Sequence, residues 1–129
     1  MPKDYGSNAR AAHWWRKAAE QGLAKAQYNL GVMYDNGTGI PEDNAKAAHW
    51  YRKAAEQGLP WSQFNVGKMY AKGLGVKQSD IEAYAWWWAA AERGHLPSAK
   101  AKNTLAKYMS ERDFAKAKKL AGNTGRNEC

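Results

Sequence analysis

The sequence predicts an all-α protein, a solenoid of three helix-turn-helix repeats followed by a C-terminal capping helix. A 13-residue string at 11–23 recurs at 47–59 with Trp15 changed to Tyr51, so each residue repeats 36 positions later. A third copy starts at Ala83 and keeps the Ala, Trp, Ala-Ala-Glu and Gly positions. A fixed period of this length is typical of stacked repeats, because one repeat cannot bury its apolar face alone.

An apolar stripe with helical spacing runs through the first half of the first repeat. It consists of Ala11, Trp14, Trp15, Ala18 and Ala19. Its aromatic pair recurs as Trp50 with Tyr51 and as Trp86 with Trp87. We therefore predict a first helix in each repeat whose aromatic residues lie in the core. The helix of the first repeat ends at Gly22, where a left-handed residue costs least.

The second helix of the first repeat is predicted over about 24–36. Its inward residues are Ala26, Leu30, Met33 and Tyr34. Gly31 and Gly67 lie in the middle of the second helices, where a glycine costs about 1 kcal/mol relative to alanine. We expect close approach between helices as the compensation, so these glycines mark the packing seam. The next helices open at Asp43 and Ser79, whose side-chain oxygens cap free amide groups.

The pattern changes towards the C-terminus. In the third repeat Asn103 replaces the seam glycine and Ala106 replaces the tyrosine, so this second helix departs most from the pattern. Ser110 and the acidic residues after it predict a helix over about 110–121 that covers the last exposed face, followed by a frayed tail. The chain is thus one domain, with repeats at about 7–42, 43–78 and 79–109.

These residues carry a resemblance to a known family. The pattern Ala-x-x-Trp-aromatic-x-x-Ala-Ala-Glu-x-Gly, then Ala-x-x-Asn-Leu-Gly-x-x-Tyr, then Gly-x-Gly, is similar to Sel1-like repeats, a branch of the tetratricopeptide superfamily. The resemblance covers about residues 7–109. It implies an α-solenoid that binds other proteins or peptides as an adaptor or scaffold, often in bacterial envelope, signalling or host-contact systems.

The net charge of +8 favours anionic partners, although the charge is spread evenly over most of the chain. The exception is the segment from Ser98 to Leu120, in which seven Lys or Arg face two Asp or Glu, a net charge of +5. Three interpretations stay open: a solvated surface, a site for an acidic protein segment, and a nucleic-acid surface. No recognised nucleic-acid motif supports the last.

Composition bears on where the protein resides. No stretch approaches the roughly 18 apolar residues that a membrane helix needs, and the N-terminus has no signal-peptide pattern. We expect a soluble protein, cytoplasmic as written, and periplasmic or secreted if the chain is a fragment that lacks its signal peptide. Cys129 is the single cysteine, so an internal disulfide is excluded.

The sequence holds no pattern typical of catalysis. His13 and His49 are equivalent residues on neighbouring first helices, but the third position is Ala85, and no Cys, Asp or Glu stands beside them at ligand spacing. A zinc site needs three or four ligands. The serines lack the glycine-flanked context of a nucleophile. We therefore expect no enzyme activity, no metal site and no cofactor.

Two tryptophans stand apart from the repeated aromatic pair. Trp61 replaces Lys25 of the first repeat, and Trp88 replaces Arg16 and Arg52. A large indole where equivalent residues are charged either fills a local gap or forms an exposed contact, and exposed tryptophan is a common interface anchor. Because two repeats carry arginine at this register, we expect the fold to tolerate arginine at position 88.

The ridge of the first helices is the predicted contact surface for a protein or peptide. We expect these helices to line the concave side of the solenoid, with equivalent residues stacked side by side. The predicted partner-binding residues are Arg10, His13, Lys17, Lys46, His49, Lys53, Trp61, Ala85 and Trp88. The groove would change from basic to apolar along its length and suit an acidic or C-terminal peptide. The alternatives are an oligomerising structural module and an accessory domain of a larger protein.

Overall fold

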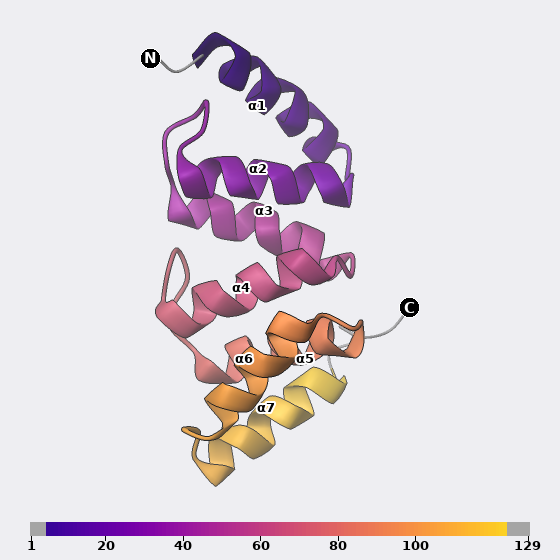
Figure 1. The fold of residues 1–129 in the computed structure, drawn as a ribbon, viewed down its shortest axis with the longest axis vertical. Helices are drawn as coiled ribbons and strands as arrows, with labels where there is room; N and C mark the ends of the chain where they lie inside the picture. Colours follow the sequence, from indigo (N-terminus) through magenta and orange to yellow (C-terminus); the bar gives the residue numbers. More distant parts are fainter. Residues whose placement is uncertain (1–4, 124–129) are drawn as a thin grey trace.

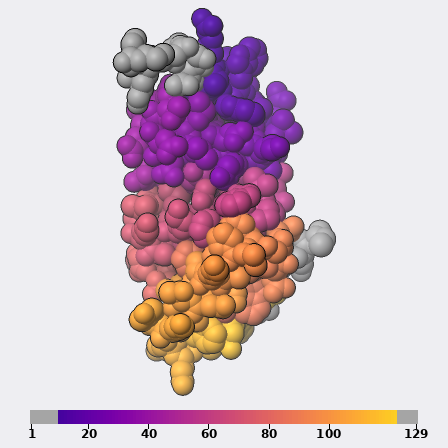
Figure 2. All heavy atoms as spheres, viewed as in Figure 1, coloured from indigo at the N-terminus to yellow at the C-terminus, as the bar shows by residue number. Residues whose placement is uncertain are grey.

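The computed structural model describes residues 5–123, with side chains from Arg10 to Gly122, and it is helical throughout. Its elements are α1 (Tyr5–Glu20), α2 (Ala24–Asn36), α3 (Asn44–Glu56), α4 (Pro60–Lys72), α5 (Asp80–Glu92), α6 (Leu96–Ala106) and α7 (Glu111–Asn123). From α1 to α5 the helices stack in chain order, and α6 and α7 both pack on α5 towards the other end of the molecule (Figure 1). In the space-filling view the repeats follow one another as layers down the long axis (Figure 2). The predicted all-α solenoid is confirmed.

The helix boundaries follow from local chemistry that recurs with the repeat. The Asp43 carboxylate accepts a hydrogen bond from the Lys46 backbone amide at 3.0 Å, and the Ser79 hydroxyl accepts one from Glu82 at 3.1 Å. Both caps satisfy an amide that the first turn leaves free. At the other end α2 stops at Gly37, whose φ of 68° is left-handed. The predicted caps and the bounds of α2 are confirmed.

The seam between repeats depends on two glycines without side chains. A β-carbon at position 31 would lie 2.7 Å from Cδ1 of Tyr51, and one at position 67 would overlap the Trp87 indole. Tyr51 of α3 is therefore seated on α2, and Trp87 of α5 is seated on α4. The cost of glycine within a helix is offset by this close approach. The predicted role of Gly31 and Gly67 is confirmed.

The prediction that the repeated aromatic pairs lie in the core is only partly right. Tyr51, Trp86 and Trp87 are buried, but Trp14 is 66% exposed and Trp15 is 38% exposed. An aromatic residue at the second position of the pair is covered by the second helix of the preceding repeat. No such helix lies beyond α1 in the described residues, so the same sequence is buried in α3 and exposed in α1.

The C-terminal helix packs on the first helix of the last repeat. α7 packs on α5, and its Ser110 cap accepts a hydrogen bond from the Asp113 backbone amide at 3.1 Å. The position of α6 that corresponds to the seam glycine is Asn103. A side chain here prevents a following helix from packing on α6 as closely as Tyr51 of α3 packs on Gly31 of α2. The predicted tail overlaps α7 at Gly122 and Asn123, and its remainder lies outside the described residues.

Candidate functional site

A row of basic and histidine side chains lies exposed along α1 and α3. We call it the basic ridge; it consists of Arg10, His13, Lys17, Lys46, His49 and Lys53. Each histidine stands edge-on to the next residue: His13 and Trp14 have ring centroids 5.6 Å apart, and His49 and Trp50 have centroids 5.1 Å apart. The Lys17 ammonium lies 5.8 Å from the Trp14 ring centroid. Equivalent residues thus adopt equivalent arrangements in two successive repeats.

The basic ridge does not continue onto α5 as an apolar surface. Ala85 and Ala89, which correspond to His49 and Lys53, are both completely buried. α3 makes extensive contacts with two helices, α2 and α4, whereas α5 makes them with three, α4, α6 and α7. The additional burial therefore comes from α7. Ala85 offers no surface to a partner, and the predicted change from a basic to an apolar groove is wrong.

Alanine on both sides allows this close contact. Ala117 and Ala121 of α7 are buried, at 0% and 2% exposure, and Phe114 packs edge-on against Tyr84 with ring centroids 5.3 Å apart. Two adjacent turns of α7 thus each contribute a buried alanine, and the buried residues of α5 include alanines as well. The same face carries histidine and lysine on α3, where no helix of the described chain covers it.

Trp88 is half-buried, and it replaces arginine in the same repeat in which alanine replaces the tyrosine that the arginine contacts. In the first two repeats an arginine at this register donates to a tyrosine hydroxyl: Arg16 to Tyr34 at 2.8 Å and Arg52 to Tyr70 at 2.6 Å. The third repeat has no such tyrosine, because Ala106 stands there. The indole of Trp88 instead packs beside Tyr84 and under the Lys102 ammonium, 5.6 Å from its ring centroid.

This pairing changes what we expect of arginine at position 88. Trp88→Arg should lower the free energy of unfolding by about 1–2 kcal/mol, because the indole contacts are lost and no tyrosine is present to accept from the guanidinium. Trp88→Arg combined with Ala106→Tyr should regain part of this loss, because it restores the pair seen in the other repeats. Thermal unfolding of the single and double variants measures the coupling. If the two single changes in the free energy of unfolding simply add up to that of the double variant, the pairing is contradicted.

Trp61 is the most exposed of the predicted contact residues outside the basic ridge, at 54% exposure. Its ring meets His95 edge-on, with centroids 4.3 Å apart. His95 is buried, its Nδ1 lies 2.7 Å from the Ser98 hydroxyl, and burial lowers the pKa of the imidazole. Trp61 thus covers a buried polar group with one face and offers the other to solvent, which combines the two roles considered from sequence.

A lateral groove recurs in successive repeats and was not expected from sequence. In the middle of the stack it has a volume of about 180 Å³ and a mixed lining, which consists of Asp35, Tyr51, Asn65, Lys68, Met69, Lys72 and Leu74. One repeat further on, the groove has about 480 Å³. Its lining is Trp87, Lys100, Ala101, Thr104, Leu105 and Tyr108. The register of the two linings is the same, but the polar side chains of the first are replaced by a mostly apolar set.

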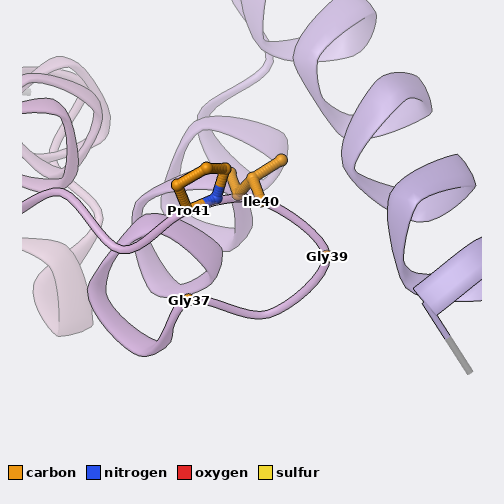
Figure 3. Close-up of a pocket in the computed structure, with 4 residues that line it drawn as sticks. All are labelled: Gly37, Gly39, Ile40 and Pro41. Carbon is orange, nitrogen blue, oxygen red and sulfur yellow. The ribbon is translucent and has the colours of Figure 1, made fainter. Parts of the chain in front are cut away.

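Another hollow lies at the loop between α2 and α3. It has a volume of about 330 Å³ and is lined by Gly37, Gly39, Ile40 and Pro41. Figure 3 shows that Ile40 and Pro41 are the side chains that this loop contributes. Neither side chain carries a charge or a nucleophile, so this hollow has no chemistry of its own.

Among residues 5–123, no three His, Cys, Asp or Glu side chains gather as they would to hold a metal ion. Within the same range, no helix has both the length and the apolar character that crossing a membrane requires.

The fold and its surfaces define an α-solenoid repeat protein. Residues 1–23, 24–59 and 62–95 match the Sel1 repeat family. These matches cover more than half of the chain, so the protein belongs to the Sel1 repeat family, whose members are typically protein-interaction scaffolds. The second match begins with α2 and the third begins within α4, both second helices, whereas the units proposed from sequence begin at first helices.

Similar proteins are longer than this chain. A solved structure of c5321, a protective antigen of uropathogenic Escherichia coli strains that displays an SLR fold, is 35% identical with a TM-score of 0.88, over 92% of this chain and 26% of that one. A Sel1 repeat protein from Oxalobacter formigenes is 41% identical with a TM-score of 0.71, over 73% and 39%. The chitin synthase regulator SKT5 of Malassezia restricta is 51% identical over 37 residues, which make up 29% of this chain and 3% of that protein.

Proposed function

We propose that this protein is a non-catalytic adaptor that binds an acidic, helical segment of another protein along the basic ridge. The observation that carries the proposal is the way α7 is held. α7 is an amphipathic helix that packs on α5, where the positions corresponding to His49 and Lys53 are the buried residues Ala85 and Ala89. The equivalent faces of α3 and α1 have no covering helix among the described residues. The chain itself thus provides an example of a helix bound to this face.

The charges of the basic ridge favour the acidic character of the partner. Four Lys or Arg side chains lie exposed on it, and an exposed pair of opposite charges contributes roughly 0.2–1 kcal/mol. Several such pairs mainly increase the association rate and fix the orientation of the partner. A helix with carboxylates along one face meets this requirement as a binding segment.

Selection from a displayed peptide library tests the proposal. We expect the protein to enrich peptides rich in Asp and Glu, with an affinity that falls as salt rises. Lys17→Glu combined with Lys53→Glu should lower the affinity for the selected peptides by roughly tenfold at low salt. The matched control is Lys72→Glu with Lys77→Glu, which makes the same change in net charge at exposed lysines outside the basic ridge.

Two results would contradict the proposal. One is a set of selected peptides without acidic enrichment; the other is equal loss of binding in both double variants, which would indicate a general effect of net charge. Sedimentation of the unmodified protein addresses the alternative function, an oligomerising module: a stable dimer that Lys17→Glu and Lys53→Glu dissociate would assign the basic ridge to self-association.

A further inference from the structure

The lateral groove of the third repeat has lost most of the polar lining that the groove of the second repeat has. At two shared registers the residues stay aromatic or apolar, with Trp87 in place of Tyr51 and Leu105 in place of Met69. At three others, longer polar side chains give way to shorter or less polar ones: Asn65 to Ala101, Lys68 to Thr104 and Lys72 to Tyr108. The volume of the third-repeat groove is accordingly larger, at about 480 Å³ against about 180 Å³.

Stacking of repeats does not close this kind of groove. In the second repeat α5 follows α4 and packs on it, yet α5 contributes no residue to the lining of the groove. In the third repeat the chain also continues past the groove, through residues 107–110 into α7, which packs on α5 instead. The groove therefore stays accessible with helices before and after it.

The connection after the second helix explains why the third-repeat groove is wider. In the second repeat, Leu74 of the connection 73–79 lines the groove, and Met69 is buried. The connection 107–110 is shorter and has Ser110 at the register of Leu74. Leu105, the equivalent of Met69, is only half-buried. An apolar side chain that is buried in the second repeat is thus partly accessible in the third.

The floor of the third-repeat groove is rigid. The Trp87 indole is packed on Gly67, and its Nε1 donates to the Phe64 carbonyl at 3.0 Å. At the rim, Tyr108 is 83% exposed. A fixed aromatic floor loses little conformational freedom when a ligand binds, and exposed aromatic residues are common anchors of interfaces.

Positive charge surrounds this apolar surface. Lys100 lines the groove, and the exposed Lys107 is next to Tyr108 in the sequence. Both belong to the segment from Ser98 to Leu120, whose net charge is +5. An occupant that complements the groove therefore combines apolar side chains with more than one carboxylate.

We infer that the third-repeat groove binds an acidic, amphipathic helical segment of another protein. Apolar side chains of this segment enter the groove between Trp87 and Tyr108, and its carboxylates face Lys100 and Lys107. The inference does not rest on the proposed function. Trp87 lies two residues from Ala85, whose register belongs to the basic ridge, and residues two positions apart project from opposite sides of a helix.

The shape of the groove favours a protein segment over a membrane surface. Trp87 is 7% exposed and lies at the bottom of the groove, where a flat bilayer would not reach it. The lining residues of α6 run from Lys100 to Tyr108, a length of about 12 Å at 1.5 Å per residue. This length accommodates two apolar side chains four positions apart on an α-helix.

The peptide acetyl-Glu-Ala-Leu-Glu-Ala-Glu-Leu-Ala-Glu-amide serves as the probe, because it has this spacing and four carboxylates. We expect it to bind the full-length protein and to shift the indole N–H signal of Trp87 in a proton–nitrogen correlation spectrum. Loss of the signal in Trp87→Tyr identifies it. The same peptide with serine for both leucines should bind at least tenfold more weakly. With glutamine for glutamate, binding should weaken at least threefold at low salt and less at high salt.

A protein variant that restores the second-repeat residues separates the groove from general charge attraction. Thr104→Lys with Tyr108→Lys changes two exposed residues and should keep the melting temperature. It should lower the affinity for the leucine peptide at least fivefold, because lost apolar contact outweighs the gain from exposed ion pairs. Leu23→Lys with Ala115→Lys adds the same charge at exposed residues outside the groove and should not weaken binding.

Several results would overturn the inference. One is the absence of a Trp87 shift at millimolar peptide, and another is equal binding of the leucine and serine peptides. Unchanged or tighter binding by the Thr104→Lys and Tyr108→Lys variant would show that charge alone attracts the peptide. Self-association that this variant abolishes would assign the groove to a second copy. Binding to phosphatidylserine vesicles that the variant abolishes would assign it to a membrane.

Discussion

Gly67→Ala is expected to lower the free energy of unfolding by about 2 kcal/mol. The added methyl overlaps the indole of Trp87, which is nearly buried and whose Nε1 is hydrogen-bonded to the Phe64 carbonyl at 3.0 Å. The ring therefore cannot move without losing that bond. Overpacking of this kind costs about 1–3 kcal/mol or more, and the higher helix propensity of alanine offsets about 1 kcal/mol. The melting temperature, followed by circular dichroism, should fall by about 8 °C.

A glycine in open surroundings provides the control for this substitution. Gly122 lies in α7, and a β-carbon there would meet no atom within 4 Å. Gly122→Ala should leave the melting temperature unchanged or raise it slightly, because only the gain in helix propensity remains. If Gly67→Ala were as stable as Gly122→Ala, the close approach at position 67 would not be what holds the second and third repeats together.

Ala117→Glu is expected to detach α7 from α5, with a loss of about 3 kcal/mol. Ala117 is completely buried, and a carboxylate cannot be buried there without a partner. The helix will leave α5 instead, so the loss is limited to the free energy with which α7 is docked. That free energy comes mainly from burial of Phe114, Ala117 and their neighbours, at about 25 cal/mol per Å² of apolar surface. Detachment should expose Tyr84, which packs against Phe114, to solvent.

Ala115→Glu is the matched control, because Ala115 is an exposed residue of the same helix. It adds the same charge two residues away and should change the melting temperature little. Limited proteolysis should cleave the Ala117→Glu variant after Lys107, in the segment between α6 and α7, and leave the control intact. Equal stability of the two variants would show that α7 does not cap the repeats.

Much of the fold was predictable because its signals are local and repeated. The caps at Asp43 and Ser79 depend on one side chain and an amide three residues away. The bounds of α2 depend on its apolar stripe and on Gly37, which adopts a left-handed φ. The seam glycines were recognisable for a similar reason: a glycine that recurs in the middle of a helix indicates close packing, even before its partner is known.

The candidate site was less predictable, because exposure depends on neighbours. Periodicity placed Trp15 on the same face as Tyr51, but it carried no information on whether a helix covers that face. Ala85 was assigned to the surface because His13 and His49 are polar; the structure buries it under α7. The groove beside Leu105 recurs at the register of Met69, and its volume depends on how helices distant in the sequence pack together.

The sequence by itself thus determined the repeat, the helices, their caps and the glycines at which they meet. The caps and helix bounds depend on residues within one helical turn. The meeting points depend on a glycine that recurs at the same position of α2 and α4. Only the tertiary structure decided which copies of a repeated surface are covered. Burial is a property of two segments. The nearly identical residues at 11–23 and 47–59 therefore differ in exposure, because α3 lies against a preceding second helix and the described α1 does not.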